Sequence, residues 1–238
     1  MLPSERIIVA LDTTEADAAV AMASKLSQVV GGVKLGKEFF TANGPDAVGR
    51  ITDVGLPLFL DLKFHDIPNT VAAAVRAALP LKPHMINVHA SGGPAMMRAA
   101  AEVAAEAGQD RPLVLGVTVL TSLRSSDLSA MGVAGPVRDH VLRLAHLAKD
   151  CGLDGVVCSA EEVVALRGAC GRGFKLVVPG IRPLWATKDD QKRVLTPSDA
   201  VSLGADYLVI GRPITKADDP AAAARRIGEE IGGIAVGA

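Results

Sequence analysis

Short apolar runs alternate with longer segments of helical periodicity along the chain. The runs are rich in β-branched residues, and the segments between them are rich in alanine. This alternation is typical of a parallel sheet covered by helices. The predicted strands are Ile7–Leu11, Val33–Leu35, Leu58–Leu62, Met85–Val88, Leu113–Val117, Gly155–Cys158, Leu176–Val178 and Tyr207–Ile210.

A helical segment follows each predicted strand, and several segments carry a start signal. Thr13 and Thr14, together with Asp17, predict the start of the first helix, because side-chain oxygens accept free backbone N–H groups there. Proline loses no hydrogen bond at a first helical position. Prolines therefore predict helices from Pro94 through Ala107, from Pro136 through Lys149, at Pro197 and Ser198, and from Pro220 over Ala221–Ile231.

The number of these units predicts the fold. Eight β/α units in 238 residues indicate a single α/β domain over residues 1–238, a (β/α)8 TIM barrel, with an open doubly wound sheet as the alternative. No linker, repeat or low-complexity segment divides the chain. The longest non-periodic stretch is Pro179–Thr196, and loops of that length in compact domains are usually functional lids or binding loops.

Composition argues against two classes of partner. Lys and Arg total 25 against 26 Asp and Glu, so the chain has no basic field for nucleic acid or an anionic membrane. Aromatic residues make up only 3%, which argues against a surface for stacking bases. No apolar run reaches membrane-spanning length. We therefore expect neither a nucleic-acid partner nor a membrane partner.

The cysteines, the histidines and the first residues indicate a cytoplasmic protein without a metal centre. The number of cysteines is odd and their spacing matches no zinc pattern, which favours reduced thiols at Cys151, Cys158 and Cys170. The five histidines show no metal-ligand spacing either. The first strand follows Glu5 and Arg6 directly, without the apolar region and cleavage site of a signal peptide.

The third predicted strand carries charges at the end where barrel active sites lie, the carboxyl ends of the strands. Residues i and i+2 of a strand share a face, so Asp61 and Lys63 should point into the barrel, while Leu60 and Leu62 face the helices. Lys34 on the neighbouring strand is expected to join them. Buried charges persist only when paired. The cluster is either a structural ion pair or a catalytic group, and three charges at this end favour catalysis.

A phosphate site is predicted independently of this cluster. Barrels often bind phosphate with the loops after strands seven and eight. Gly180 and Arg182 follow the seventh predicted strand, and Gly211 and Arg212 follow the eighth. Glycine lets a backbone N–H approach an oxyanion, and arginine supplies a fork of donors. Gly211 alone also fits a tight turn, but Arg212 beside it favours phosphate binding.

The charged residues lie in motifs that resemble one enzyme family. The segment Asp61–Thr70 resembles the signature of the orotidine 5′-phosphate decarboxylases, the last enzymes of UMP synthesis. Its Asp-x-Lys-x-x-Asp pattern is shared with a sister family of sugar-phosphate decarboxylases, so the ordered set of motifs carries the specificity. The similarity to the short bacterial form continues through Ile8–Asp12, Val33–Gly36, Asn87–Gly92, Val117–Ser122, Pro179–Pro183, Asp190–Val194 and Ala205–Ile214.

The resemblance implies decarboxylation of orotidine 5′-phosphate to UMP without a cofactor. Lys63 is then the acid that protonates C6 as carbon dioxide leaves, and Asp61 lies against the substrate carboxylate. Lys34, Asp61, Lys63 and Asp66 form an alternating charge network. No pyridoxal or thiamine motif is visible to act as an electron sink, so fixed charge must stabilise the carbanion.

The resemblance also implies how the substrate is held. Asp12 and Lys34 hold the ribose hydroxyls, and Thr121 or the adjacent Ser122 meets the pyrimidine edge. Gln191 bridges phosphate and base as the loop closes. The remaining substrate-binding residues implied are Asp61, Ile67, Thr70, Arg182, Gly211 and Arg212, of which Arg182, Gly211 and Arg212 bind the phosphate together with Gln191.

A homodimer with shared active sites is a further implication. Asp66 and Thr70 are expected to reach the site of the partner subunit. Ile67 and Pro68 redirect the chain after Asp66, so this turn need not point back into its own barrel.

Two other functions are less well supported. A metal-assisted keto-sugar-phosphate decarboxylase of the sister family would want a carboxylate where Lys34 stands, and Lys34 would repel a metal ion. A non-catalytic nucleotide-binding barrel would not explain why Lys63 and both aspartates are intact. Departures from the family pattern are small: Val178 stands where threonine is frequent, and aromatic residues are few.

Overall fold

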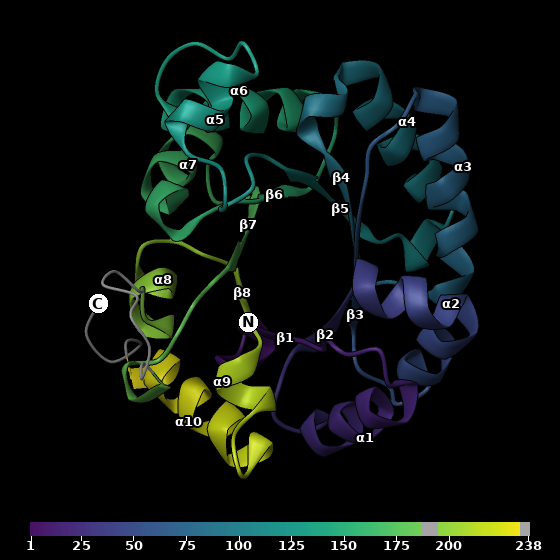
Figure 1. The fold of residues 1–238 in the computed structure, drawn as a ribbon, viewed down its shortest axis with the longest axis vertical. Helices are drawn as coiled ribbons and strands as arrows, with labels where there is room; N and C mark the ends of the chain where they lie inside the picture. Colours follow the sequence, from purple (N-terminus) through teal and green to yellow (C-terminus); the bar gives the residue numbers. More distant parts are fainter. Residues whose placement is uncertain (187–194, 234–238) are drawn as a thin grey trace.

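The computed structural model describes residues 1–186 and 195–233, and in them eight parallel strands close into a barrel in chain order (Figure 1). Closure is completed between the first and last strands, where Ile7 pairs with Leu208. The predicted (β/α)8 barrel is thus confirmed, and the open-sheet alternative is wrong. The strands are β1 (Ile7–Ala10), β2 (Gly32–Gly36), β3 (Leu58–Phe64), β4 (Met85–His89), β5 (Leu113–Val117), β6 (Gly155–Val157), β7 (Lys175–Pro179) and β8 (Tyr207–Ile210).

Helices surround the barrel on its outer side (Figure 1). Pro94, Pro197 and Pro220 each begin a helix as predicted, but Pro136 is the cap that precedes one. The first helix begins at Ala16, later than the threonine signal suggested. The helices are α1 (Ala16–Leu26), α2 (Lys37–Thr52), α3 (Pro68–Ala78), α4 (Pro94–Ala105), α5 (Ser125–Ala130), α6 (Val137–Asp150), α7 (Val163–Cys170), α8 (Pro197–Ser202), α9 (Arg212–Thr215) and α10 (Pro220–Gly232).

Two apolar layers hold the barrel together. Side chains of alternate strand positions either fill the barrel or pack under the helices, as the two-residue period of a strand requires. Leu60 belongs to the outer layer, as predicted. The inner layer consists of Ile8, Ala10, Phe59, Met85, Leu115, Val177, Tyr207 and Val209. Toward the carboxyl ends of the strands, buried polar side chains such as Asp61 and Asn87 join this apolar filling.

The third strand is longer and less regular than its apolar pattern suggested. It continues to Phe64, two residues beyond the predicted end, because its backbone still pairs with β4 there. The register between β3 and β4 shifts between Leu60 and Phe64. Asp61 and Lys63 lie within this irregular stretch.

Across residues 1–186 and 195–233, no helix is both long and apolar enough to span a bilayer.

Candidate active site

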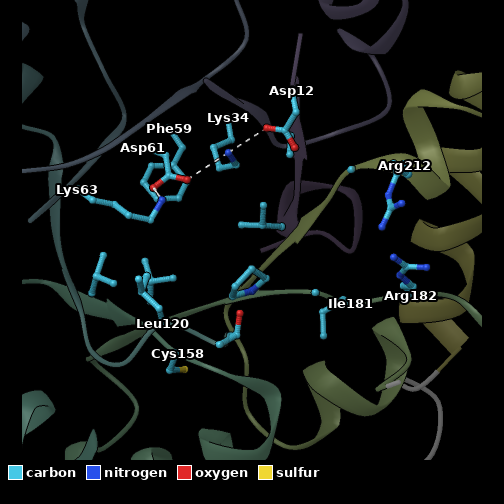
Figure 2. Close-up of a pocket in the computed structure, with 18 of the residues that line it drawn as sticks. Asp12, Lys34, Phe59, Asp61, Lys63, Leu120, Cys158, Ile181, Arg182 and Arg212 are labelled. Carbon is cyan, nitrogen blue, oxygen red and sulfur yellow. Dashed lines mark hydrogen bonds and ion pairs between the residues drawn. The ribbon is translucent and has the colours of Figure 1, made fainter. Parts of the chain in front are cut away.

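A pocket opens at the carboxyl ends of the strands (Figure 2). Its volume is about 390 Å³, within the range of small-molecule sites. Apolar side chains such as Phe59 and Val209 line it beside the charged ones. Eight of the residues predicted to act on the substrate line it: Asp12, Lys34, Asp61, Lys63, Thr121, Arg182, Gly211 and Arg212.

Asp61 is the centre of the charged cluster. Its Oδ1 lies 2.5 Å from Nζ of Lys63, and its Oδ2 lies 3.1 Å from Nζ of Lys34. Lys34 also reaches Oδ1 of Asp12 at 3.4 Å, so the charges alternate across three strand ends. Figure 2 shows this row on one side of the pocket. As expected from the sequence, Lys34 joins Asp61 and Lys63.

The environment of Asp61 keeps its carboxylate ionised. Burial alone raises its pKa, but the charges of Lys34 and Lys63 and hydrogen bonds from Lys63 and Asn87 outweigh burial and lower the pKa below its ordinary value. The side chain of Lys63 is more accessible than that of Lys34, at 26% against 11%. The cluster therefore offers a charged ammonium that faces the pocket and is held by an ionised carboxylate.

Backbone geometry at Lys63 differs from a regular strand. The sequence pattern predicted that Asp61 and Lys63 point the same way because residues i and i+2 of a strand share a face. Both do line the pocket. Lys63, however, has a left-handed backbone with φ of 52°, a region that residues other than glycine rarely adopt. The prediction that both side chains face the pocket was correct. The irregular backbone of β3, and not a regular strand, brings Lys63 there.

The pocket has a second, cationic side. Arg182 follows β7, Arg212 follows β8, and Figure 2 shows both away from Lys63. Gly180 takes a φ of 78°, which a side chain would strain, and so lets the chain turn sharply after β7. The backbone N–H of Arg182 donates to the carbonyl of Leu195 at 3.3 Å, which joins the start of the loop between β7 and α8 to its end.

Three predicted residues lie away from the pocket of their own chain. Asp66 and Ile67 on the connection from β3 into α3, and Thr70 in the first turn of α3, are exposed and do not line the pocket. Asp66 uses Oδ1 to accept the backbone N–H of Ile67 at 2.7 Å. Gln191 lies outside the described residues.

Sequence reasoning missed Asn87. Its side chain is fully buried on β4 and donates from Nδ2 to Oδ1 of Asp61 at 2.7 Å. A signal was present, because an asparagine two residues after the inward-facing Met85 must also point into the barrel. His89 stands two residues further on and contacts His65, with ring centroids 5.3 Å apart. Burial lowers the pKa of His89 to about 4, so this ring is neutral near pH 7.

The donors in the pocket fit a self-neutralised cluster better than a metal site. Within the described ranges, no three His, Cys, Asp or Glu side chains gather as metal ligands. The ammonium of Lys34 lies between the carboxylates of Asp12 and Asp61, where it neutralises the groups that a divalent cation would need.

Comparison with known proteins places this geometry in a family. The model of the orotidine 5′-phosphate decarboxylase / HUMPS family matches residues 5–227. The orotidine 5′-phosphate decarboxylase of Rhodospirillum rubrum is 58% identical over 97% of this chain and 96% of its own length. That of Paramagnetospirillum magneticum is 54% identical over 95% and 98%. The crystal structure of the Lactobacillus acidophilus enzyme superposes with a TM-score of 0.85 at 38% identity, covering 94% of this chain and 98% of that one.

The closed barrel and its charged mouth define a (β/α)8-barrel enzyme, with the site where such enzymes carry it. With these matches, the chain belongs to the orotidine 5′-phosphate decarboxylase / HUMPS family.

Proposed function

We propose that this chain decarboxylates orotidine 5′-phosphate to UMP in pyrimidine nucleotide synthesis, and that Lys63 supplies the proton. One observation carries the proposal. The pocket joins an ammonium–carboxylate cluster on one side to Arg182 and Arg212 on the other, so a single nucleotide can offer a carboxylate to one and a phosphate to the other. The named relatives, which are orotidine 5′-phosphate decarboxylases, support it.

In the proposed step the bond between C6 and the carboxyl carbon breaks, and carbon dioxide leaves. The electron pair stays on C6, where the ring offers no easy delocalisation. The ammonium of Lys63 stabilises this pair by its charge and then donates a proton to C6. Lys63 is left neutral and recovers a proton from solvent through the open mouth.

The neighbouring charges prepare Lys63 for this step. Asp61 forms an ion pair with Lys63 at 2.5 Å, which holds the ammonium in place, and it lies where the substrate carboxylate arrives. Lys34 balances the second oxygen of Asp61, and with Asp12 it offers donors and acceptors to ribose hydroxyls. Thr121, which lines the pocket, or the adjacent Ser122 meets the pyrimidine edge. Arg182, Gly211 and Arg212 bind the phosphate, whose binding energy positions the distant C6.

A direct assay tests the activity. Purified protein is mixed with orotidine 5′-phosphate, and loss of its absorbance is followed together with release of carbon dioxide and formation of UMP. We expect turnover by the wild-type chain and none by a Lys63→Ala control. An inert wild-type protein that instead decarboxylates a keto-sugar phosphate would move the chain to the sister branch of its family.

We also propose that the active chain is a homodimer with shared sites. Asp66, Ile67 and Thr70 are exposed beside the pocket-forming strand, and Ile67 offers 68% of its surface to a second copy of the chain. A second copy would cover this turn and receive Asp66 near its own Lys63. Ile67 and Thr70 would then contact the substrate of the partner subunit.

Subunit exchange tests the shared site. Lys63→Ala and Asp66→Ala proteins, each inactive alone, are mixed and allowed to exchange. If Asp66 acts in the partner, each hybrid dimer has one intact site, so random mixing restores about a quarter of wild-type sites. A mixture that stays inactive, although native mass spectrometry shows hybrids, would mean that Asp66 acts within its own chain.

A cytoplasmic location without nucleic-acid or membrane partners completes the proposal. The near-zero net charge of −1 and three free cysteines support it.

A further inference from the structure

Asn87 makes two hydrogen bonds that meet at the proposed proton donor. Its Nδ2 donates to Oδ1 of Asp61 at 2.7 Å, and its Oδ1 accepts the backbone N–H of Lys63 at 2.8 Å. A carboxylate only accepts and a backbone N–H only donates, so both roles of the amide are determined. One fully buried side chain therefore binds the backbone of Lys63 and the carboxylate that holds its ammonium.

The position of Asn87 explains why an amide is needed there. Leu60 pairs with Ile86, and Phe64 pairs with Val88. Three residues of β3 thus stand opposite Asn87 alone, and the ladder between the strands is interrupted.

Lys63 is the last of these extra residues, and its left-handed backbone carries its N–H away from the regular ladder. The oxygen of Asn87 takes the place of the missing backbone acceptor. A buried N–H without a partner is unfavourable, so this bond favours the unusual conformation at Lys63.

We propose that Asn87 is a positioning residue for the decarboxylation. It does not line the pocket, so it acts through Lys63 and Asp61. By holding the backbone of one and the carboxylate of the other, it determines where the ammonium stands relative to C6. This inference rests on the proposed function and assigns a residue to the same site.

The first test compares Asn87→Ala with Val88→Ala. Val88 is the next residue on β4, is equally buried, and belongs to the outer apolar layer, so its truncation matches the loss of packing without touching Lys63. We expect kcat of Asn87→Ala to fall about a hundredfold, the scale of a 1 Å misplacement. Affinity for UMP should change by no more than about threefold, because its phosphate and ribose contacts remain. Val88→Ala should lower Tm and keep kcat.

The second variant, Asn87→Asp, keeps nearly the same shape and stays informative if Asn87→Ala does not fold. It retains an acceptor for the N–H of Lys63 but sets a carboxylate against Asp61. At high pH the two carboxylates repel; at low pH they share a proton, which restores a donor between them. The other ionisable groups around them are Asp12, Lys34, Lys37, Lys63, His65 and His89.

The expected signature is a ratio of variant to wild-type kcat that rises as pH falls from about 8 to about 6. A role in folding alone would not produce it. Asn87→Ala and Asn87→Asp proteins that both fold and keep kcat within about threefold of Val88→Ala would overturn the inference.

Crystal structures separate this inference from the proposed function. The Asn87→Ala structure should show Nζ of Lys63 displaced from its place beside Asp61, and an unmoved lysine contradicts the inference. If the wild-type chain does not decarboxylate orotidine 5′-phosphate, the proposed function fails. The displacement of Lys63 then decides by itself whether Asn87 positions it.

Discussion

Charged side chains lie at both ends of the barrel, the base at the amino ends of the strands and the mouth at their carboxyl ends. They are held in different ways at the two ends. At the base, Asp154 precedes β6 and accepts the backbone N–H of Val114 at 2.7 Å while Arg111 binds its other oxygen at 2.9 Å. At the mouth, Asp61 is bound by the side chains of Lys34, Lys63 and Asn87. The base ties its carboxylates to the backbone, whereas the mouth ties its carboxylate to ammonium groups on long, adaptable stems.

A second pair at the base repeats the same arrangement. Asp206 precedes β8 and accepts the backbone N–H of Leu176 at 2.8 Å and Nη2 of Arg167 at 2.6 Å. Arg167 also donates to the carbonyls of Gly171, Phe174 and Gly204. Each carboxylate thus joins its own strand to the preceding one and fixes their register.

The difference separates charges that stabilise the fold from charges arranged for chemistry. The ion pairs at the base of the barrel use their hydrogen-bonding capacity on the protein itself. At the mouth, Lys63 and Arg212 face a cavity and keep capacity for a substrate. Substitutions at the mouth should therefore lower activity much more than stability, and substitutions at the base should do the reverse.

The largest expected effect is at Lys63. Lys63→Ala should lower kcat by about 10⁴-fold or more, because one ammonium supplies both charge stabilisation and the proton. UMP should still bind, and Tm should stay close to wild type. Steady-state kinetics, nucleotide titration and thermal melts measure the three quantities. Lys149→Ala, which removes an ammonium that binds the carbonyl of Cys170, is the control. A kcat within about tenfold of wild type would contradict the assignment of Lys63 as the proton donor.

Arg212→Ala should have the next largest effect. It should weaken substrates that carry the 5′-phosphate by about 2–5 kcal/mol, the scale of truncating one partner of a desolvated charge pair. A substrate without phosphate should react almost as before. Comparing kcat/KM for the two substrates measures the difference, with Arg225→Ala on the exposed face of α10 as control. Equal losses for both substrates would make Arg212 a structural residue like those of the base.

At the base, Arg167→Ala should destabilise the fold and spare the chemistry. It removes the arginine donor from Asp206 and from three carbonyls, which should cost about 3 kcal/mol. For a chain of this size that lowers Tm by about 2–4 °C per kcal/mol. Thermal melts and kcat at a temperature below both transitions give the two quantities. Loss of kcat in a protein that remains folded would mean that the two ends are not independent.

Chelation should have the smallest effect. Activity should survive EDTA, because the ammonium groups of Lys34 and Lys63 supply the positive charge at the mouth. The measurement is turnover before and after chelation, and again after adding Mg²⁺. Activity that is lost and then restored by Mg²⁺ would indicate the metal-assisted chemistry of the sister branch.

Much of the fold and part of the site could be predicted from the sequence. Alternation of apolar runs with helical segments predicted all eight strands, because burial imposes its periodicity on the chain directly. The position of Asp61 and Lys63 near a strand end, and of Arg182 and Arg212 after the last two strands, placed them at one mouth. Those inferences need only the order of elements and the rule that barrel sites lie at strand ends.

The tertiary structure decided what depends on pairing between strands. Asn87 and Lys63 are 24 residues apart, and only the shifted register between β3 and β4 brings the amide to the backbone N–H. The left-handed backbone of Lys63 follows from the same shift. Likewise, the sequence indicated that Asp66 need not point back into its own barrel, and the packed structure shows that it does not line its own pocket. Periodicity records which residues are buried, but not which distant residue each one meets.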